Sequence, residues 1–207
     1  MKKFKTEQEA FWADPKWAVE YIKRNNQDII KDNIKVFSDI LSSTTNVSSV
    51  IEFGSNIGLN LHAINSLSQN MDISAIEISQ DAVNELNKLE FVKTVYHESI
   101  LDIQIDRQRD LSLIKGVLIH INPEFLELIY EKLYKFSSKY IVIAEYYNPT
   151  PVTISYRGNN ERLFKRDFAG EMLDKYPDLE LVDYKFHYHR DNNFPQDDIT
   201  WFLLRKK

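Results

Sequence analysis

The stretch from Val50 to Leu61, VIEFGSNIGLNL, constrains the fold of this chain more than any other. An apolar run ends with an acid and a phenylalanine, a turn with two glycines follows, and apolar residues then recur at helical spacing as far as Ile64. Gly54 and Gly58 lack a Cβ, so the backbone can turn sharply and a ligand can approach it closely. The order of strand, tight turn and helix predicts the opening of a βαβ unit.

A second acid, Glu77, ends a later apolar run from Ile73 to Ile76. It lies about 20 residues beyond the glycines, the separation at which a carboxylate in a nucleotide-binding fold accepts hydrogen bonds from ribose hydroxyls. The helix start after Gly58 would also offer unpaired N–H groups and the positive end of a dipole. These features favour a ligand site over an ordinary strand–turn–helix junction.

The glycine turn differs from the dinucleotide fingerprint G-x-G-x-x-G, whose second glycine lets a pyrophosphate come close. Here the order is Glu52-x-Gly54-x-Asn56-x-Gly58, with an acid first and an asparagine in the middle glycine's place. The pattern resembles motif I, E/D-x-G-x-G-x-G, of the class I S-adenosylmethionine-dependent methyltransferases. The resemblance implies that the turn passes under the methionine part of S-adenosylmethionine and that the acid after the second strand binds its ribose. The residues implied at this end are Glu52, Gly54, Ser55, Asn56, Gly58, Glu77 and Ile78.

Strand and helix patterns alternate along the rest of the chain. Helices are predicted after Ser79, from Asn122-Pro123-Glu124 onward, and over 169–176 before Pro177. Further strands are predicted at 91–96, 110–121, 140–145, 179–188 and 199–205, the last two as an antiparallel pair. We therefore expect an α/β protein with a Rossmann-like, seven-stranded, mostly parallel sheet, an antiparallel C-terminal hairpin, and helices on both faces.

The first 45 residues form a helical lead-in rich in aromatic residues. Residues 4–41 have helical patterning, and Asp14-Pro15 suits an N-cap followed by a proline in the first turn. Such a segment could cover the cofactor as a lid or pack on the edge of the sheet, and the sequence leaves both open. No internal repeat or linker interrupts the chain, so we expect residues 1–207 to form a single domain with residues 1–45 as its cap.

Composition excludes several classes of function. The chain of 207 residues has a net charge of −5 and no basic tail, so nonspecific binding to nucleic acid lacks its electrostatic basis. It has no cysteine, which excludes disulfides and thiolate metal sites. No apolar run approaches the roughly 18 residues of a membrane helix, and we expect a cytoplasmic protein. The oligomeric state stays open.

The ends of the third and fourth strands carry further candidate residues. In the class I family an acid and small residues after the third strand lie beside the adenine ring, which implies this place for Glu98, Ser99 and Ile100. At the end of the fourth strand the resemblance implies Lys115 and Gly116 in the cofactor site.

His120 would stand just past the carboxyl end of the sheet, where open α/β folds bind ligands. A lone histidine in an apolar segment is more often structural. Its place above the expected cofactor leads us to the hypothesis that His120 is the general base or orients the acceptor.

Residues 146–168 interleave tyrosine with basic and amide side chains after the clearest buried strand. A solvated charged loop is the plain interpretation. Because tyrosine stacks on rings and arginine binds carboxylate or phosphate, we favour an insertion that binds the methyl acceptor. Its predicted acceptor-binding residues are Tyr146, Tyr147, Tyr156, Arg157 and Arg166.

Several blocks resemble one branch, the methyltransferases associated with pseudaminic acid biosynthesis. They are EFGSNIGLNL at 52–61, GVLIHINPE at 116–124, YNPTPV at 147–152, YRG at 156–158, LFKRDFAG at 163–170 and NFPQDDITW at 193–201. The resemblance implies a nonulosonic-acid or surface-glycan setting and a small acidic sugar or sugar nucleotide as the acceptor.

Two other functions stay open at this point. A nicotinamide- or sugar-nucleotide-binding oxidoreductase would share the fold, although G-x-G-x-x-G and a Tyr-x-x-x-Lys pair are missing. A protein that binds the cofactor without catalysis is the other alternative. His187 and His189, with Asp197 or Asp198, could bind a metal, but a polar hairpin loop is favoured there and we expect no metal site.

Overall fold

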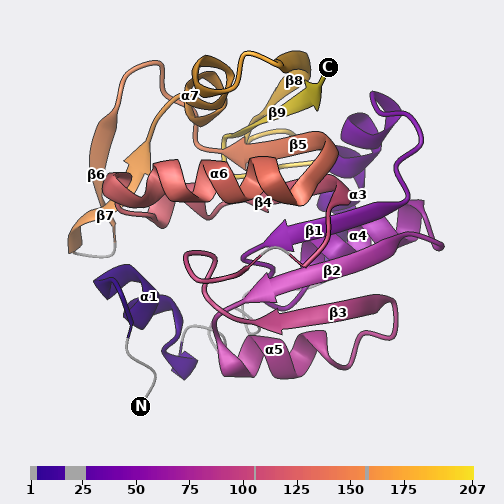
Figure 1. The fold of residues 1–207 in the computed structure, drawn as a ribbon, viewed down its shortest axis with the longest axis horizontal. Coiled ribbons are helices and arrows are strands. Elements are labelled where there is room, and N and C mark those ends of the chain that lie inside the picture. The colour runs from indigo at the N-terminus through magenta and orange to yellow at the C-terminus, as the bar shows by residue number, and fades with distance from the viewer. Residues whose placement is uncertain (1–3, 17–26, 105, 157–158) are drawn as a thin grey trace.

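The computed structural model describes residues 4–16, 27–104, 106–156 and 159–207. Its main element is a seven-stranded sheet in the order β3-β2-β1-β4-β5-β9-β8 (Figure 1). The strands are β1 (Ser49–Phe53), β2 (Asp72–Glu77), β3 (Val92–His97), β4 (Arg109–Lys115), β5 (Ser137–Glu145), β8 (Leu179–His187) and β9 (Ile199–Lys206).

Strand direction confirms the predicted sheet. β1 pairs in parallel with β2 and β4, β2 with β3, and β4 with β5. β9 pairs antiparallel with both β5 and β8, so β9 is the reversed strand and β8 runs in the direction of β5. The chain therefore has the predicted seven-stranded, mostly parallel sheet with an antiparallel C-terminal hairpin.

The described residues form helices that cover both faces of the sheet and one helix, α1 (Glu7–Trp12), that stands apart from it (Figure 1). The others are α3 (Gln27–Ser42), α4 (Leu59–Leu67), α5 (Gln80–Leu86), α6 (Leu126–Phe136) and α7 (Phe168–Lys175), with the 3₁₀ helices η1 (Leu118–His120) and η2 (Pro123–Phe125). One core cluster joins α6 and α7 to the sheet, and a second cluster on the other face joins α3, α4 and α5.

Successive side chains of the central strands point alternately into the two clusters. In β1, Ile51 and Phe53 belong to the cluster under α6 and α7, while Val50 belongs to the opposite cluster. In β5, Ile141 and Val142 divide in the same way. Because both faces are buried, these strands read as continuous apolar runs, which is why the sequence located them so clearly.

The N-terminal segment lies beyond the carboxyl ends of the strands. α1 stands apart from the sheet, on the side to which the arrowheads of β1 and β2 point (Figure 1). A capping box fixes its start: the Thr6 hydroxyl accepts a hydrogen bond from the Glu9 N–H at 3.0 Å, and the Glu9 carboxylate accepts from Thr6. The predicted helix start at Pro15 is confirmed, since Asp14 Oδ1 accepts from the Lys16 N–H at 3.0 Å.

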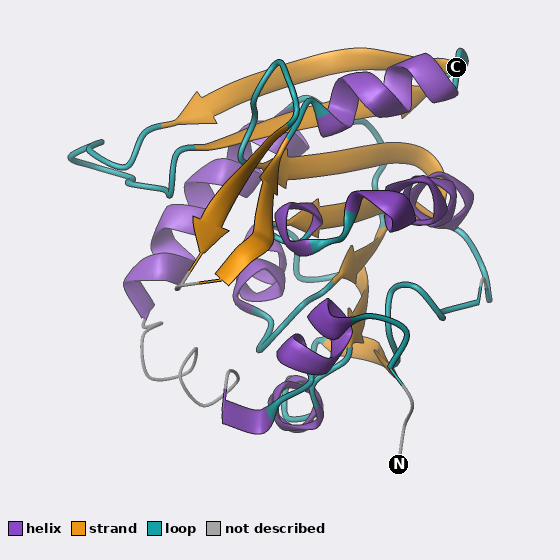
Figure 2. Cartoon of the chain, turned by 90° about the vertical axis from the view of Figure 1, so that its left-hand side faces the viewer, coloured by secondary structure: helices purple, strands orange, loops and turns teal. Residues whose placement is uncertain are grey.

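One prediction about local structure was wrong. Residues 110–121 are not one strand: β4 ends at Lys115, Gly116 takes a φ of 68°, and residues 118–120 form η1. The insertion at 146–168 contains an antiparallel hairpin of β6 (Val152–Tyr156) and β7 (Asn159–Lys165), which the sequence did not predict and which Figure 2 shows as a pair of strands apart from the main sheet. β7 packs beside η1.

Candidate functional site

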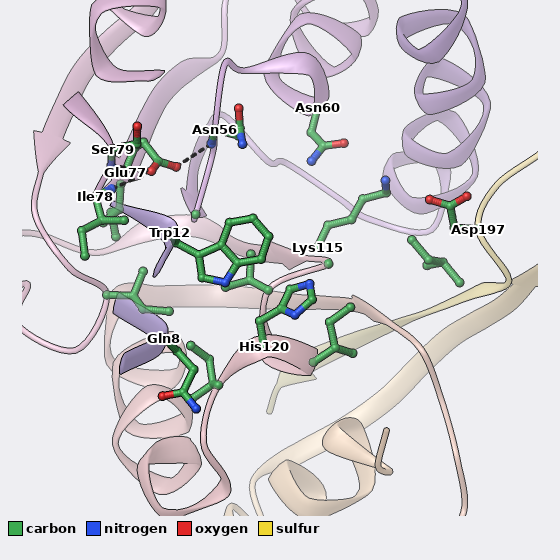
Figure 3. Close-up of a pocket in the computed structure, with 18 of the residues that line it drawn as sticks. Gln8, Trp12, Asn56, Asn60, Glu77, Ile78, Ser79, Lys115, His120 and Asp197 are labelled. Carbon is green, nitrogen blue, oxygen red and sulfur yellow. Dashed lines mark hydrogen bonds between the residues drawn. The ribbon is translucent and has the colours of Figure 1, made fainter. Parts of the chain in front are cut away.

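A cavity of about 450 Å³ opens at the carboxyl ends of β1, β2 and β4, which is where open α/β sheets bind ligands. α1 contributes Gln8, Glu9 and Trp12 to its wall, and the β8–β9 loop contributes Asp197 (Figure 3). The cavity wall therefore combines the ends of the central strands with segments from the N-terminal and C-terminal parts of the chain.

The glycine turn forms one wall of this cavity, and its backbone N–H groups are all occupied. The Gly54 and Ser55 N–H groups donate to the Ile76 carbonyl at 2.9 and 3.0 Å, and the Gly58 N–H donates to the Ser55 carbonyl at 2.9 Å. The Asn56 N–H donates to Glu77 Oε2 at 2.7 Å, and the Ile57 N–H to Asn56 Oδ1 at 2.8 Å. The turn therefore keeps its shape without a bound anion.

Both glycines of the turn are required by geometry. Gly54 and Gly58 have φ values of 76° and 84°, a left-handed conformation that favours glycine. A Cβ on Gly54 would stand 2.7 Å from Val117 Cγ2, and one on Gly58 would stand 2.8 Å from Leu89 Cδ1. Gly54 thus brings β1 close to the turn after β4, whereas Gly58 lets α4 start close to the segment after α5.

Glu77 lies at the end of β2 and is held by three backbone donors. Its Oε1 accepts from the Ile78 and Ser79 N–H groups at 2.8 and 2.7 Å, and Oε2 accepts from Asn56. Burial raises the pKa of Glu77, and the three N–H donors oppose that rise. The carboxylate lines the cavity in one fixed orientation (Figure 3), and its two oxygens have capacity for further donors.

A group of buried charges lies beneath the next part of the cavity. Glu52 is fully buried; its Oε1 accepts from Asn60 Nδ2 at 2.6 Å, and its Oε2 has no partner among the described residues. Burial raises the pKa of Glu52 to about 8, against the effects of Asn60 and Lys115. Burial lowers the pKa of Lys115, and the charges of Glu52 and Asp197 oppose this. Asn60 and Lys115 line the cavity close to each other (Figure 3).

Beyond β2 and β3 the cavity wall includes apolar side chains. Ile78, Ile100 and Leu101 line it together with Ser99, whose hydroxyl donates to the Glu9 carboxylate. This bond ties α1 to the loop after β3. A wall of apolar side chains with a few polar groups among them suits a flat heterocycle.

His120 lies in the middle of the cavity wall beneath α1. η1 places it 9% exposed, and its ring centroid is 4.8 Å from that of Trp12 (Figure 3). The His120 N–H donates to the Val117 carbonyl at 2.9 Å, so the ring extends from a defined turn. Because Trp12 covers one side of the imidazole, the site combines a histidine with an apolar cover.

The structure brings most of the predicted cofactor residues together. Those that line the cavity are Gly54, Asn56, Glu77, Ile78, Glu98, Ser99, Ile100, Lys115 and Gly116, and His120 joins them. Three others support the wall from behind. Glu52 holds Asn60, Ser55 donates its hydroxyl to the Glu52 carbonyl at 3.1 Å, and Gly58 begins α4.

The predicted acceptor residues are divided. Tyr146 lines the cavity. Tyr147 is 42% exposed with its ring 5.8 Å from Phe202, and Arg166 Nε donates to Glu171 Oε1 at 2.7 Å, so neither is among the residues that line the cavity. Tyr156 ends β6, and Arg157 lies outside the described residues. The predicted pocket of five residues is therefore reduced to Tyr146 among the side chains that the structure describes.

Several lining residues were missed by sequence reasoning: Gln8, Glu9, Trp12, Asp32, Asn33, Asn60, Gln196 and Asp197. Asn60 carried a usable signal, because a polar residue in the first turn of the helix after a glycine turn faces the ligand. The others come from segments whose docking depends on tertiary contacts. Gln196 Nε2, for instance, donates to Asn33 Oδ1 at 3.3 Å across 163 positions of sequence.

The histidine pair near the C-terminus has other contacts. His187 Nε2 accepts from Trp201 Nε1 at 3.0 Å, and His189 Nδ1 lies 2.8 Å from Asp198. Within the described parts of the chain, no three histidine, aspartate or glutamate side chains are grouped as metal ligands would be. None of the described helices has both the length and the apolar character of a membrane span.

Comparisons with known proteins agree on the fold. No protein-family model and no curated protein matches this sequence. The plantazolicin methyltransferase BpumL in complex with SAH is 15% identical, with 97% of this chain and 93% of that chain covered and a TM-score of 0.66. A SAM-dependent methyltransferase from Leishmania major is 14% identical, with 97% and 82% covered and a TM-score of 0.72. The chain has the class I methyltransferase fold.

A third structure with this methyltransferase fold matches over the full length of the chain. The 1,6-didemethyltoxoflavin-N1-methyltransferase of Burkholderia thailandensis, crystallised with 1,6-didemethyltoxoflavin and S-adenosylhomocysteine, is 12% identical with a TM-score of 0.69, and the match covers 100% of this chain and 93% of that chain. At such low identity the likeness concerns the fold.

Proposed function

We propose that this chain is an S-adenosylmethionine-dependent methyltransferase acting on a small polar acceptor. The observation that carries the proposal is Glu77. Its carboxylate lies at the end of β2, is fixed by three backbone donors, and lines the cavity beside the glycine turn. A rigid carboxylate with spare acceptor capacity is suited to the two neighbouring hydroxyls of a ribose.

The rest of the cavity fits the other parts of S-adenosylmethionine. The apolar wall of Ile78, Ile100 and Leu101 would take the adenine. The amino-acid end carries both an ammonium and a carboxylate. Lys115 lines the wall at this end and would supply a positive charge for that carboxylate.

The glycine turn also favours this cofactor over a dinucleotide. Dinucleotide-binding folds present backbone N–H groups of the turn to a pyrophosphate. Here the N–H groups of residues 54–58 already have acceptors within the protein. S-Adenosylmethionine has no phosphate, so it makes no demand on these donors.

The side chains around His120 suit methyl transfer. When bound, S-adenosylmethionine supplies an electrophilic methyl group on a sulfonium. His120 would accept the proton of an acceptor hydroxyl or amine and orient it, while Trp12 excludes water from the same region. Positioning of the acceptor in line with the methyl group supplies a large part of the acceleration.

For the acceptor, we propose an acidic sugar or sugar nucleotide of the nonulosonic-acid kind. The support is the resemblance of the blocks at 147–152, 156–158 and 193–201 to the methyltransferases associated with pseudaminic acid biosynthesis. Tyr146, which lines the cavity, would stack on the ring of such a sugar. The cytoplasm, where sugar nucleotides are made, is the compartment that this proposal implies.

Calorimetric titration of the wild-type protein with S-adenosylhomocysteine and with NAD⁺ tests the cofactor assignment. We expect saturable binding of S-adenosylhomocysteine only; saturable binding of NAD⁺ alone would support the oxidoreductase alternative. Mass spectrometry of acidic sugars and their nucleotide derivatives incubated with the cofactor then tests for a gain of one methyl group. Cofactor binding without methylation of any of them would contradict the proposed acceptor class.

A further inference from the structure

Glu145, at the carboxyl end of β5, is a buried acid that neither motif reasoning nor the proposed reaction uses. Its side chain is 2% exposed, and its Oε1 accepts hydrogen bonds from the Val117 and Leu118 N–H groups, both at 2.9 Å. One residue earlier, the Gly116 N–H donates to the Ala144 carbonyl at 3.0 Å. The turn that follows β4 is therefore fastened to the end of β5 by three hydrogen bonds.

This turn carries His120. η1 begins at Leu118, and the first N–H groups of a short helix have no partners within it. The Glu145 carboxylate satisfies them with charge-assisted bonds in a buried environment, where such bonds are strong. The backbone N–H of His120 in turn donates to the Val117 carbonyl at 2.9 Å. The position of His120 is therefore fixed relative to Val117, whose own N–H is bonded to Glu145.

The backbone before the turn has a left-handed conformation at Gly116. Gly116 has a φ of 68°, and a Cβ built on it would meet nothing within 4 Å. Contacts at Gly116 itself therefore do not hold the turn, which is held by Val117 packed beside Gly54 and by the bonds to Glu145. Burial raises the pKa of Glu145 to about 7, with the N–H donors and Lys115 opposing the rise, so the bonds to the turn favour the charged form.

We infer that Glu145 is a positioning residue: through its bonds to Val117 and Leu118, it holds His120 in place beneath Trp12 for methyl transfer. The inference rests on the proposed function. Glu145 is not among the residues that line the cavity, so it acts through the turn and not on the ligand.

A double-mutant cycle separates positioning from a general structural role. Glu145→Ala removes both bonds, and we expect it to lower turnover about tenfold to a hundredfold with cofactor affinity unchanged. In a His120→Ala background the same substitution should have little further effect, since no imidazole remains to be positioned. Glu145→Gln keeps a carbonyl oxygen that accepts from both N–H groups, so it should restore most of the turnover.

A matched control removes a buried hydrogen bond elsewhere on the same pair of strands. Ser112 lies in β4, is fully buried, and donates to the Leu133 carbonyl at 2.9 Å. Ser112→Ala should be destabilised in the same way without a selective loss of turnover. Equal losses from Glu145→Ala in the wild-type and His120→Ala backgrounds, or equal losses from Glu145→Ala and Ser112→Ala, would overturn the inference.

NMR of the imidazole groups gives a readout that does not depend on activity. The signal missing from His120→Ala identifies His120. We expect Glu145→Ala to shift or broaden that signal while Ser112→Ala leaves it unchanged. An unchanged signal in Glu145→Ala would overturn the positioning role even in an active enzyme, whereas a shifted signal in a protein that methylates nothing would contradict only the proposed function.

Discussion

At the scale of single residues, the site depends on buried acids with different partners. Glu77 is held by three backbone donors, Glu145 by two, and Glu52 by one amide, so the three carboxylates at the ends of β2, β5 and β1 have different tasks. Glu77 faces the cavity, whereas Glu52 and Glu145 support its wall from behind. Burial raises the pKa of each of them, which links the charge of the site to pH.

His120→Ala tests the residue assigned to proton transfer. We expect turnover to fall by about 10²–10⁴, the usual contribution of a positioned acid or base, with almost no change in cofactor affinity. Steady-state rates and calorimetric titration of the same preparation give the two quantities. Full turnover in the variant would mean that His120 is structural and that proximity alone accounts for catalysis.

Glu52→Gln tests the raised pKa at the end of β1. The folded chain keeps a proton on Glu52 up to a pH of about 8, whereas the unfolded chain loses it near 4.5. The unfolded state therefore binds fewer protons between these values, so Glu52 makes the free energy of unfolding fall as the pH rises through this window. The glutamine side chain of Glu52→Gln does not titrate, so this fall in the free energy of unfolding is absent from the variant. We expect its stability relative to wild type to improve by roughly 1–3 kcal/mol between pH 5 and pH 8.

Denaturant unfolding at several pH values measures this difference. Glu77 and Glu145 also have raised pKa values, so the comparison of variant with wild type isolates Glu52 from their titration. Glu85→Gln, on the exposed side of α5 beside Lys88, is the matched control. Parallel stability curves for wild type and Glu52→Gln would rule out an unusual pKa at this position.

At the scale of elements, short connections rather than strands shape the cavity. The glycine turn, the 116–120 turn and the β8–β9 loop all meet at the carboxyl ends of the strands, and α1 closes them from the other end of the chain (Figures 1 and 3). Ser99 and Glu9 join α1 to the loop after β3, so the N-terminal segment contributes to the cavity wall. Among the described residues this favours a covering role for α1 over packing on the sheet edge.

Two glycines with similar backbone conformations test this element by substitution. Gly58 and Gly116 both have positive φ. A Cβ added to Gly58 would stand 2.8 Å from Leu89 Cδ1, whereas a Cβ added to Gly116 would meet nothing within 4 Å. Gly58→Ala should therefore lose more stability than Gly116→Ala, in which only the backbone cost of about 1–2 kcal/mol applies. Thermal unfolding of both variants measures the difference. A larger loss in Gly116→Ala would contradict the packing of α4 against the segment after α5.

At the scale of the whole molecule, the sequence predicted what depends on periodicity. β1, β2 and β5 are buried on both faces and read as continuous apolar runs, and the glycine turn joins the first of them to α4. The hairpin of β6 and β7 was missed because its strands are rich in polar residues and pair only with each other. Tyr147 and Arg166 are predicted acceptor residues that do not line the cavity. Tyr147 contacts Phe202 instead, and Arg166 donates to Glu171.

The parts of the site that escaped the sequence share one cause. Trp12, Asn33 and Asp197 reach the cavity only because α1, α3 and the β8–β9 loop dock there, and local patterns carry no information about docking. The apolar run from Tyr140 marks Glu145 only as the end of a strand, since its bonds to Val117 and Leu118 depend on the pairing of β4 with β5.

The affinity of Glu77→Ala for S-adenosylhomocysteine tests the central claim most directly. Loss of charge-assisted bonds to the ribose should cost about 1.5–3 kcal/mol, which is roughly a tenfold to hundredfold weaker Kd. Glu85→Ala, which removes an exposed acid from α5, should bind as wild type does, and thermal unfolding verifies that both variants are folded. Calorimetric titration is predicted to show the weaker Kd for Glu77→Ala alone. A folded Glu77→Ala that binds S-adenosylhomocysteine with wild-type affinity would contradict the account.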